Sequence, residues 1–168
     1  MVATIGYERA GLADFLATLK LSQIEILVDI RDRAQSRRAG FSKSALRDAL
    51  ENEGIEYLHL KELGDPKEGR EAARRGDFAQ FRLIFDGVMQ TKEAKEALKK
   101  LQGLALEKQI CLMCFERDQT TCHRKIVADH LQTLSGKKVR HLGVKDGAGK
   151  QLSVRRVYDT HQGAAAPV

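Results

Sequence analysis

Residues 114–124 bring together an unusual set of reactive side chains. Two cysteines, one histidine, two acids and two arginines occur within this segment, although the whole chain has only three cysteines and five histidines. Thiolates act as nucleophiles, imidazole and carboxylate groups move protons, and guanidinium groups hold anions. The segment therefore indicates a chemically active site, although these groups would suit several reactions.

The second half of this segment begins a helix over residues 122–134. The free N–H groups and the positive dipole end at the start of a helix attract anions. A thiol at this position has a lowered pKa, which makes Cys122 a candidate nucleophile. His123 is then a candidate general acid or base, and Arg124 adds a positive charge. The alternative is that Cys122 is a small buried residue packed against a sheet.

The first half lies at the end of an apolar strand, residues 109–115. Side chains alternate between the two faces of a strand, so Cys114 and Glu116 share a face while Cys111 points to the opposite side. We therefore do not expect Cys111 and Cys114 to act together as a C-x-x-C pair. Cys114 is a second candidate nucleophile, with Glu116 as a proton carrier, or alternatively a buried core cysteine.

A metal site would use Cys114, Cys122 and His123. The seven residues between the two thiols are not a zinc-finger spacing, and the adjacent Cys122 and His123 should diverge on a helix. No residue is therefore assigned to a metal, and zinc is kept as an alternative with Glu116 as a further ligand. A reversible Cys114–Cys122 disulfide is less expected in a reducing cytoplasm.

Apolar strands alternate with helical segments along the chain. This alternation predicts a mostly parallel central sheet of about five strands flanked by helices, an α/β three-layer sandwich. Residues 64–76 are expected to form a charged loop. We predict a single domain over residues 1–144 and a basic, partly flexible extension over 145–168, with a turn at 146–147 followed by a short strand or a tail. The predicted strands cover residues 2–5, 24–30, 55–60, 109–115 and 138–142, and the helices begin near residues 12, 42, 77, 92 and 122.

Unusual polar residues lie at the predicted carboxyl ends of these strands. Ligands of open parallel sheets bind outside that edge, so these residues should converge. Asp29 and Arg31 share one face of their strand and either hold a substrate anion or form an ion pair that organises the following loop. The predicted substrate-binding residues are Gly6, Tyr7, Asp29, Arg31, His59 and Arg124, beside the candidate catalytic residues Cys122, Cys114, Glu116 and His123.

The composition narrows the class of protein. The 168 residues are 42% hydrophobic and 31% charged, which suits one globular domain without membrane spans. The start of the chain lacks a signal-peptide pattern, and three cysteines are too few to staple a secreted fold, so we expect a cytoplasmic protein. The net charge of +6 favours an anionic small molecule or a nucleic acid as partner. An aromatic content of 5% weakens base stacking as the main binding mode.

Four separate motifs occur in an order that is familiar from one protein family. They are Thr4-Ile5-Gly6-Tyr7, Val28-Asp29-Ile30-Arg31, Gly54-Ile55-Glu56-Tyr57-Leu58-His59 with Leu63-Gly64, and Cys114-Phe115-Glu116 with Cys122-His123-Arg124. The chain resembles the bacterial and archaeal family called domain of unknown function 488 over roughly residues 2–142. The resemblance implies an intracellular α/β domain with these motifs in its site. Many members have histidine in place of Tyr7 and a proline in the loop at 33–36, so this chain departs from them there.

These observations favour an enzyme that acts on a phosphate-bearing substrate, a nucleotide or a nucleic acid. Arg31, Arg124 and the helix start would hold the anion, while Cys122 or Cys114 attacks. One alternative is a nucleic-acid-binding module without catalysis, based on the basic loop over residues 31–43. Another is a metal-binding or redox-sensing protein. No obligatory cofactor and no oligomeric state is predicted.

Overall fold

A five-stranded parallel sheet forms the centre of the computed structural model, which describes residues 1–153. The strand order is β3-β2-β4-β1-β5, and every neighbouring pair is parallel. The three inner strands are fully buried apolar runs, as expected for a parallel sheet that is covered on both faces. The strands are β1 (Val2–Gly6), β2 (Ile26–Asp29), β3 (Glu56–His59), β4 (Ile110–Cys114) and β5 (Val139–Leu142).

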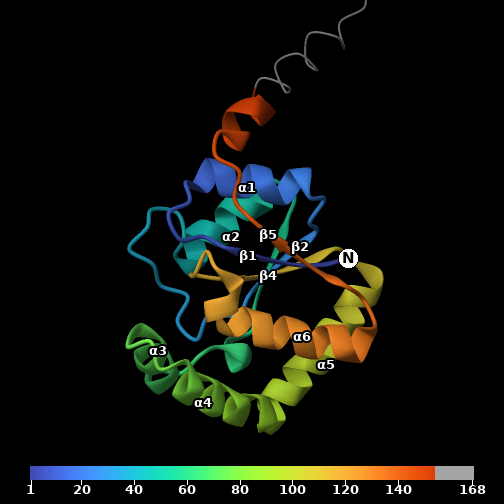
Figure 1. Cartoon of the computed structure of the whole chain (residues 1–168). Helices are drawn as coiled ribbons and strands as arrows, with labels where there is room; N and C mark the ends of the chain where they lie inside the picture. Colours follow the sequence, from blue (N-terminus) through green and yellow to red (C-terminus); the bar gives the residue numbers. More distant parts are fainter. Residues whose placement is uncertain (154–168) are drawn as a thin grey trace, which may run out of the picture.

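Helices cover both faces of the sheet and complete the predicted three-layer sandwich (Figure 1). One face packs against α1 (Leu12–Leu21) and α2 (Lys43–Asn52), and the other against α3 (Lys67–Arg74), α4 (Phe78–Gln90), α5 (Lys92–Glu107) and α6 (His123–Ser135). Cys111 belongs to the first core and Cys114 to the second, which confirms that they point to opposite sides of β4. No helix within residues 1–153 is both long and apolar enough to cross a bilayer.

Two segments differ from the sequence predictions. The expected loop at 64–76 contains α3, whose apolar face is so narrow that only Gly69 and Ala72 are buried. An apolar stripe this narrow on a highly charged helix produces little hydrophobic periodicity in the sequence, so the helix was not predicted. The turn at 146–147 is present, but it leads into helical residues 148–153 rather than a strand, and the rest of the predicted extension lies outside the described residues. Backbone N–H groups of Gly147 and Gly149 donate to the Asp14 carboxylate and hold this segment against α1.

The chain leaves the two neighbouring strands β1 and β4 in opposite directions. After β1 it passes beyond β4 to reach β2 by way of α1, and after β4 it passes beyond β1 to reach β5 by way of α6. These two helices pack on opposite faces of the sheet. Such a topological switch point opens a crevice at the carboxyl ends of the strands. The fold therefore places this crevice beside Gly6 and Cys114, the last residues of β1 and β4.

Candidate active site

A cavity of about 950 Å³ lies at the carboxyl ends of β1, β2 and β4. Its walls come from the segments that follow these strands and from α3, and Cys114, Glu116 and His123 line it. The volume is within the range of pockets that bind small molecules of nucleotide size. Arginines outnumber acids in its lining by seven to four, so the cavity is positively charged. The predicted convergence of polar residues at this edge is thus present, with an excess of guanidinium groups.

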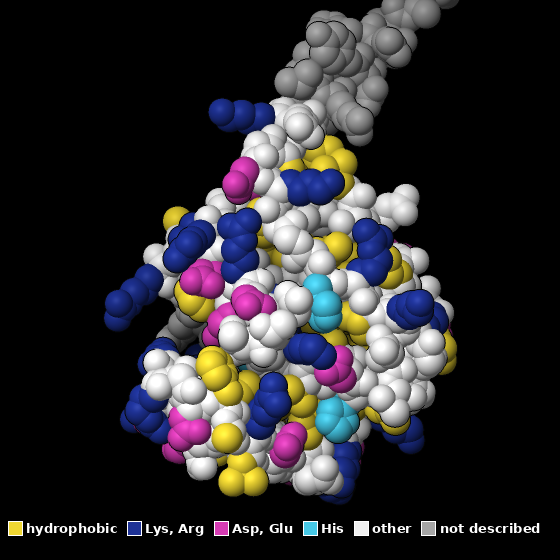
Figure 2. Space-filling model, viewed as in Figure 1, with side chains coloured by type: hydrophobic (Ala, Val, Ile, Leu, Met, Phe, Trp, Pro, Cys, Tyr) yellow, Lys and Arg dark blue, Asp and Glu magenta, His cyan; other side chains and the backbone are white. Residues whose placement is uncertain are grey.

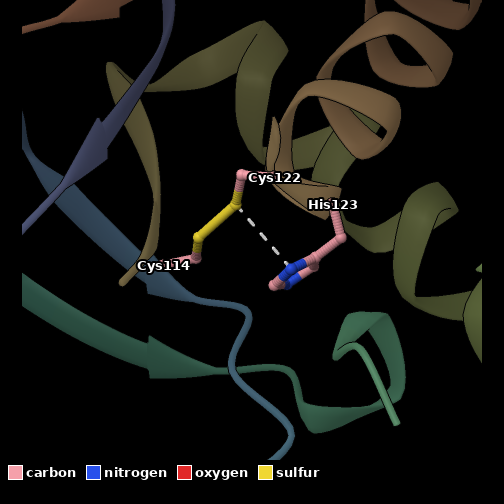
Figure 3. Close-up of side chains that lie close together, drawn as sticks. All are labelled: Cys114, Cys122 and His123. Carbon is pink, nitrogen blue, oxygen red and sulfur yellow. Dashed lines mark hydrogen bonds between the residues drawn. A yellow bond between two sulfur atoms is a disulfide. The ribbon is translucent and has the colours of Figure 1, made fainter. Parts of the chain in front are cut away.

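Cys114 and Cys122 are joined as a disulfide between the end of β4 and the start of α6 (Figure 3). From the sequence this disulfide was the less expected arrangement, because a reducing compartment disfavours disulfide bonds. The structure brings the sulfurs together because a short helical turn over Gln119–Thr121 returns the chain to the strand end. The Cα atoms are 7.8 Å apart, and Cys114 Sγ lies 2.9 Å from a carboxylate oxygen of Glu116. Both cysteines are buried, with Cys114 0% and Cys122 3% exposed, and only Cys114 is among the residues that line the cavity within the described part of the chain.

His123 adds an imidazole to the two sulfurs. Cys122 is the N-cap of α6 and has extended backbone angles, so the expected divergence of two adjacent helical side chains does not apply. Its Sγ lies 3.8 Å from His123 Nδ1, as Figure 3 shows. His123 Nε2 donates to the Ile30 carbonyl at 3.0 Å, because a carbonyl can only accept. Burial lowers the pKa of His123 to about 4, so the ring is neutral with a free lone pair on Nδ1.

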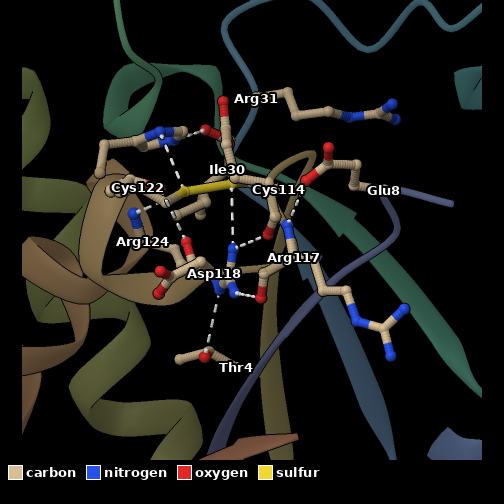
Figure 4. Close-up of a disulfide and its surroundings, with 12 residues drawn as sticks. Thr4, Glu8, Ile30, Arg31, Cys114, Arg117, Asp118, Cys122 and Arg124 are labelled. Atoms are coloured by element: carbon tan, nitrogen blue, oxygen red, sulfur yellow. Dashed lines mark hydrogen bonds between the residues drawn. A yellow bond between two sulfur atoms is a disulfide. The ribbon is translucent and has the colours of Figure 1, made fainter. Parts of the chain in front are cut away.

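Arg124 holds the backbone at this strand end (Figure 4). Its guanidinium donates to the carbonyl of Glu116 and, at 2.9 Å, to that of Arg117, while Nη1 lies 3.6 Å from Cys114 Sγ. The side chain is 1% exposed, and burial lowers its pKa. Arg124 therefore positions the segment that carries Cys114, and its direct contact with a substrate stays a prediction.

Gly6 permits a close approach of two strand ends. A Cβ at this position would overlap the carbonyl oxygen of Glu116, which passes directly over the glycine. Beyond it, the backbone N–H of Glu8 donates to Phe115 at 2.8 Å. The close neighbour of Gly6 in the structure is the protein's own chain, and an approach of the Gly6 backbone to a ligand stays a prediction. Gly6 thus shapes the crevice rather than lining it.

At the end of β2, Asp29 and Arg31 form a buried two-point ion pair. Arg31 Nε and Nη2 donate to the two Asp29 oxygens at 2.8 and 2.6 Å. The Tyr57 hydroxyl donates to Asp29 at 2.7 Å, and Arg31 Nη1 donates to the Tyr7 hydroxyl and the Phe41 carbonyl, both at 2.9 Å. Burial opposes the charge of Arg31, but the hydrogen bonds to Asp29 outweigh it and raise the pKa of the guanidinium. The ion pair organises the loop after β2, and Arg31 also lines the cavity.

His59 and Tyr7 support the same loop. His59 Nε2 donates to the Arg31 carbonyl at 2.8 Å, and His59 is absent from the residues that line the cavity within the described part of the chain. The Tyr7 ring stacks on Phe41 with centroids 4.5 Å apart and faces the cavity. Tyr7 and Arg31 therefore lie where the sequence predicted substrate contacts, whereas His59 reaches the site only through Arg31.

Comparison with known proteins gives one match. Residues 11–131 match the family described as a domain of unknown function, DUF488. The chain belongs to the DUF488 family. No curated protein and no solved structure matches this DUF488 chain. The family confirms the resemblance seen in the motifs, and the fold and site rest on the geometry described above.

Several residues that line this cavity had not been predicted, and two of them, Asp65 and Phe115, bear on its chemistry. Asp65 is 6% exposed, and its Oδ1 has no hydrogen-bond partner within residues 1–153. Burial raises the pKa of Asp65 to about 7, with Glu116 and Asp32 raising it further and Arg70 opposing. The Gly64-Asp65-Pro66 sequence signalled only a turn, because the helix that follows was not predicted. Phe115 is an apolar side chain that is 43% exposed at the cavity.

Proposed function

We propose that this DUF488 protein is a cytoplasmic enzyme that acts on a phosphate-bearing substrate of nucleotide size, with Cys114 as its nucleophile. The observation that carries the proposal is the arginine-rich cavity at the switch point, which has a thiol position in its wall. Guanidinium groups bind phosphate oxygens in pairs of hydrogen bonds, and thiolates attack electrophilic centres. A cytoplasmic location would keep this thiol reduced.

Exposed arginines of the loop after β2 are available for the anion. Arg33 and Arg37 line the cavity and have no ion-pair partner within residues 1–153. In contrast, Arg70 is held by Asp32 at 3.1 Å. Phe115 offers an exposed aromatic face in the same cavity, on which a base can stack. Free guanidinium groups beside an aromatic ring favour a nucleotide over a bare phosphate ester.

The position of the sulfurs favours Cys114 over Cys122 as the nucleophile. Both sulfurs belong to buried residues, but Cys114 is among the residues that line the cavity and Cys122 is not. In the reduced protein the Arg124 guanidinium, 3.6 Å from Cys114 Sγ, would stabilise a thiolate. Glu116, 2.9 Å from the same sulfur, is placed to accept the thiol proton. The sequence ranked Cys122 first as nucleophile; the proposal gives this role to Cys114, with Cys122 as its disulfide partner.

The anion part is tested by binding adenosine monophosphate and inorganic phosphate to the reduced protein. The double variant Arg33→Ala/Arg37→Ala should weaken adenosine monophosphate binding at least about tenfold. Each hydrogen bond between a guanidinium and a phosphate oxygen contributes about 1.5–3 kcal/mol. Arg82→Ala is the matched control, because Arg82 is exposed on α4, away from the cavity. Equal losses in the control and the double variant, or no binding at all, would refute the anion site.

The nucleophile is tested with a panel of phosphate-bearing substrates, from mononucleotides to short single strands. Cys114→Ser should abolish any turnover that the wild type shows while adenosine monophosphate still binds within about threefold, because a hydroxyl is far less nucleophilic than a thiolate at neutral pH. Cys122→Ser should keep turnover under reducing conditions. Turnover that survives in Cys114→Ser would rule out covalent catalysis at this sulfur.

A binding module without catalysis is the second candidate, favoured by the exposed arginines of the loop after β2. Arg33, Arg37 and Arg38 are all exposed. On the face shown in Figure 2, however, Lys and Arg side chains alternate with Asp and Glu and form no continuous basic patch. Phosphate contacts alone would make oligonucleotide affinity fall steeply with salt and leave it unchanged in Cys114→Ser. That result, with no turnover of any panel member, would favour the module.

A further inference from the structure

The side chains of Cys114, Cys122 and His123 also fit a metal ion. We propose that the reduced protein binds one zinc ion through Cys114 Sγ, Cys122 Sγ and His123 Nδ1. These three atoms lie within 4.8 Å of one another, and all three residues are buried. The inference goes beyond the proposed function and does not depend on it, since it concerns the cluster itself and not the anion-binding wall.

The spacing of the ligand atoms suits a tetrahedral ion. Zinc with Zn–S of about 2.3 Å and Zn–N of about 2.05 Å places a sulfur and a nitrogen ligand about 3.6 Å apart. Cys122 Sγ and His123 Nδ1 are 3.8 Å apart without any rearrangement. Disulfides usually span roughly 4.4–6.8 Å between Cα atoms, and the Cα atoms of Cys114 and Cys122 are 7.8 Å apart. This wide separation of the backbones leaves room for the two sulfurs to move apart around an ion.

The imidazole is already held in the tautomer that a metal needs. Ligating histidines donate their second ring N–H to a carbonyl or carboxylate, which fixes the ring and leaves the other nitrogen free. His123 Nε2 makes this bond to the Ile30 carbonyl at 3.0 Å. The ring also packs against Phe85, with centroids 5.2 Å apart. The ligand atom Nδ1 therefore points at the sulfurs in a fixed orientation.

Charge and access favour zinc at this position. Two thiolates and one divalent ion sum to a neutral centre, which a buried site tolerates better than isolated charges. Cys114 and His123 line the cavity, so the fourth position of the ion faces it. The Glu116 carboxylate, 2.9 Å from Cys114 Sγ, lies within reach of that position. Thiolate and imidazole ligands select zinc over the harder magnesium and calcium ions.

Disulfide and zinc-bound forms are alternative states of the same cysteines. A peroxide can oxidise the two thiolates to the disulfide: one S–S bond forms, the peroxide O–O bond breaks, and two protons are taken up as hydrogen peroxide becomes two waters. The zinc ion then leaves as the hydrated cation. Zinc binding would in turn mask Cys114, so the metal and a covalent reaction at this sulfur exclude one another.

The test uses the full chain, reduced with a phosphine and freed of metal. Titration with Co²⁺ should give one bound ion per chain with the absorption of a tetrahedral thiolate complex, and Zn²⁺ should displace it. The disulfide form should bind no ion at this site. Absence of the thiolate absorption in the folded, reduced wild type would overturn the proposal without need of any variant.

Variants assign the ligands. Cys114→Ser, Cys122→Ser and His123→Ala should each lower zinc affinity at least about tenfold, the loss that even outer partners of a metal site cause. Cys111→Ala is the matched control, because Cys111 is buried on the other face of β4 and should leave binding unchanged. Unchanged affinity in Cys114→Ser, or a loss in Cys111→Ala alone, would exclude this ligand set. Circular dichroism of each variant verifies that it is folded.

The two proposals can fail separately. Zinc binding is measured without any phosphate compound, and adenosine monophosphate binding is measured without metal. Zinc should slow alkylation of Cys114 by iodoacetamide at least about tenfold, because a bound thiolate is not free to attack. Alkylation that is equally fast with and without saturating zinc would place the ion elsewhere.

Discussion

The ends of β2 and β4 each bury an arginine, but the two charges are compensated in different ways. Arg31 makes two-point contact with the Asp29 carboxylate, which is itself fully buried. Arg124 donates to backbone carbonyls and to Thr4, and no carboxylate within residues 1–153 lies in ion-pair distance. The β2 end is thus a closed, neutral network, whereas the β4 end carries a positive charge beside two sulfurs on which Glu116 and Asp118 act only from beyond ion-pair distance.

This difference separates a scaffold from a reactive centre. A paired arginine keeps its neighbour ionised and fixes a loop, but has little attraction left for a ligand. An unpaired, buried guanidinium favours negative charge on whatever lies next to it, here the Cys114 sulfur at 3.6 Å. The same residue type in two similar locations therefore fixes a loop at the β2 end, whereas under the proposed function it promotes reactivity at the β4 end.

The largest expected effect comes from breaking the paired network. Asp29→Ala leaves Arg31 buried without a partner and should lower the free energy of unfolding by about 3–5 kcal/mol in urea titrations. The double variant Asp29→Ala/Arg31→Met should recover at least about half of that loss, since the stranded charge is removed too. No recovery would mean that the pair is not energetically coupled.

Arg124 supplies the contrasting case. Arg124→Met should also destabilise the protein by about 3 kcal/mol, because carbonyls that it satisfies become unpaired. Adding Glu116→Gln should restore nothing, since Arg124 contacts the carbonyl of Glu116 rather than its carboxylate. Recovery in this double variant would show that Glu116 compensates Arg124, and the two strand ends would then be alike.

An intermediate effect is expected at Asp65, a buried acid that lacks the fixed partner of Asp29. Its pKa of about 7 means that it is neutral below pH 7 and negative above it. A negative Asp65 repels anions, so sulfate binding should weaken about tenfold from pH 6 to pH 8. Sulfate does not titrate in this range, and the disulfide form keeps the two sulfurs from titrating.

Asp65→Asn should keep the tight binding of low pH across the whole range. Glu116, Asp32 and Arg70 are the charged groups that act on Asp65, and Glu116 also has a pKa raised by burial. The variant therefore separates Asp65 from Glu116: a pH dependence that persists in Asp65→Asn belongs to Glu116. Asp48→Asn, on the exposed side of α2, should follow the wild-type profile.

Strand parity and the switch-point rule explain why the site could be located from the sequence. Inner strands of a parallel sheet are apolar throughout, so β1, β2 and β4 gave strong signals and their ends were predictable. Asp29 with Arg31, and Cys114 with Glu116, share faces because the strand period is two. The ion pair of Asp29 and Arg31 was only one of two predicted roles. The strand period shows that the two side chains share a face, but not whether they bind each other or a substrate.

The wrong predictions for Cys122 and Asp65 concern backbone conformations that the hydrophobic periodicity of the sequence does not reveal. Cys122 and His123 were predicted to be adjacent helical residues with diverging side chains. Cys122 is instead the N-cap with an extended backbone, and its sulfur points toward His123. Asp65 was overlooked because the helix that follows it has only two buried positions. Both errors concern segments in which a few tertiary contacts decide the local conformation. The first argued against Cys122 and His123 as joint metal ligands, and the second left Asp65 out of the predicted site.

The smallest expected effect comes from removing one hydroxyl, that of Tyr57, from the hydrogen-bond network around Asp29 and Arg31. The Tyr57 hydroxyl donates to Asp29 at 2.7 Å, and burial, followed by the charge of Asp29, raises the pKa of this phenol, so it stays a donor. Tyr57→Phe should lower the free energy of unfolding by about 1 kcal/mol, because Asp29 keeps both bonds from Arg31. A loss near that of Asp29→Ala would mean that Tyr57, rather than Arg31, is the main stabilising partner of Asp29, and the β2 end would then resemble the β4 end in lacking a true charge pair.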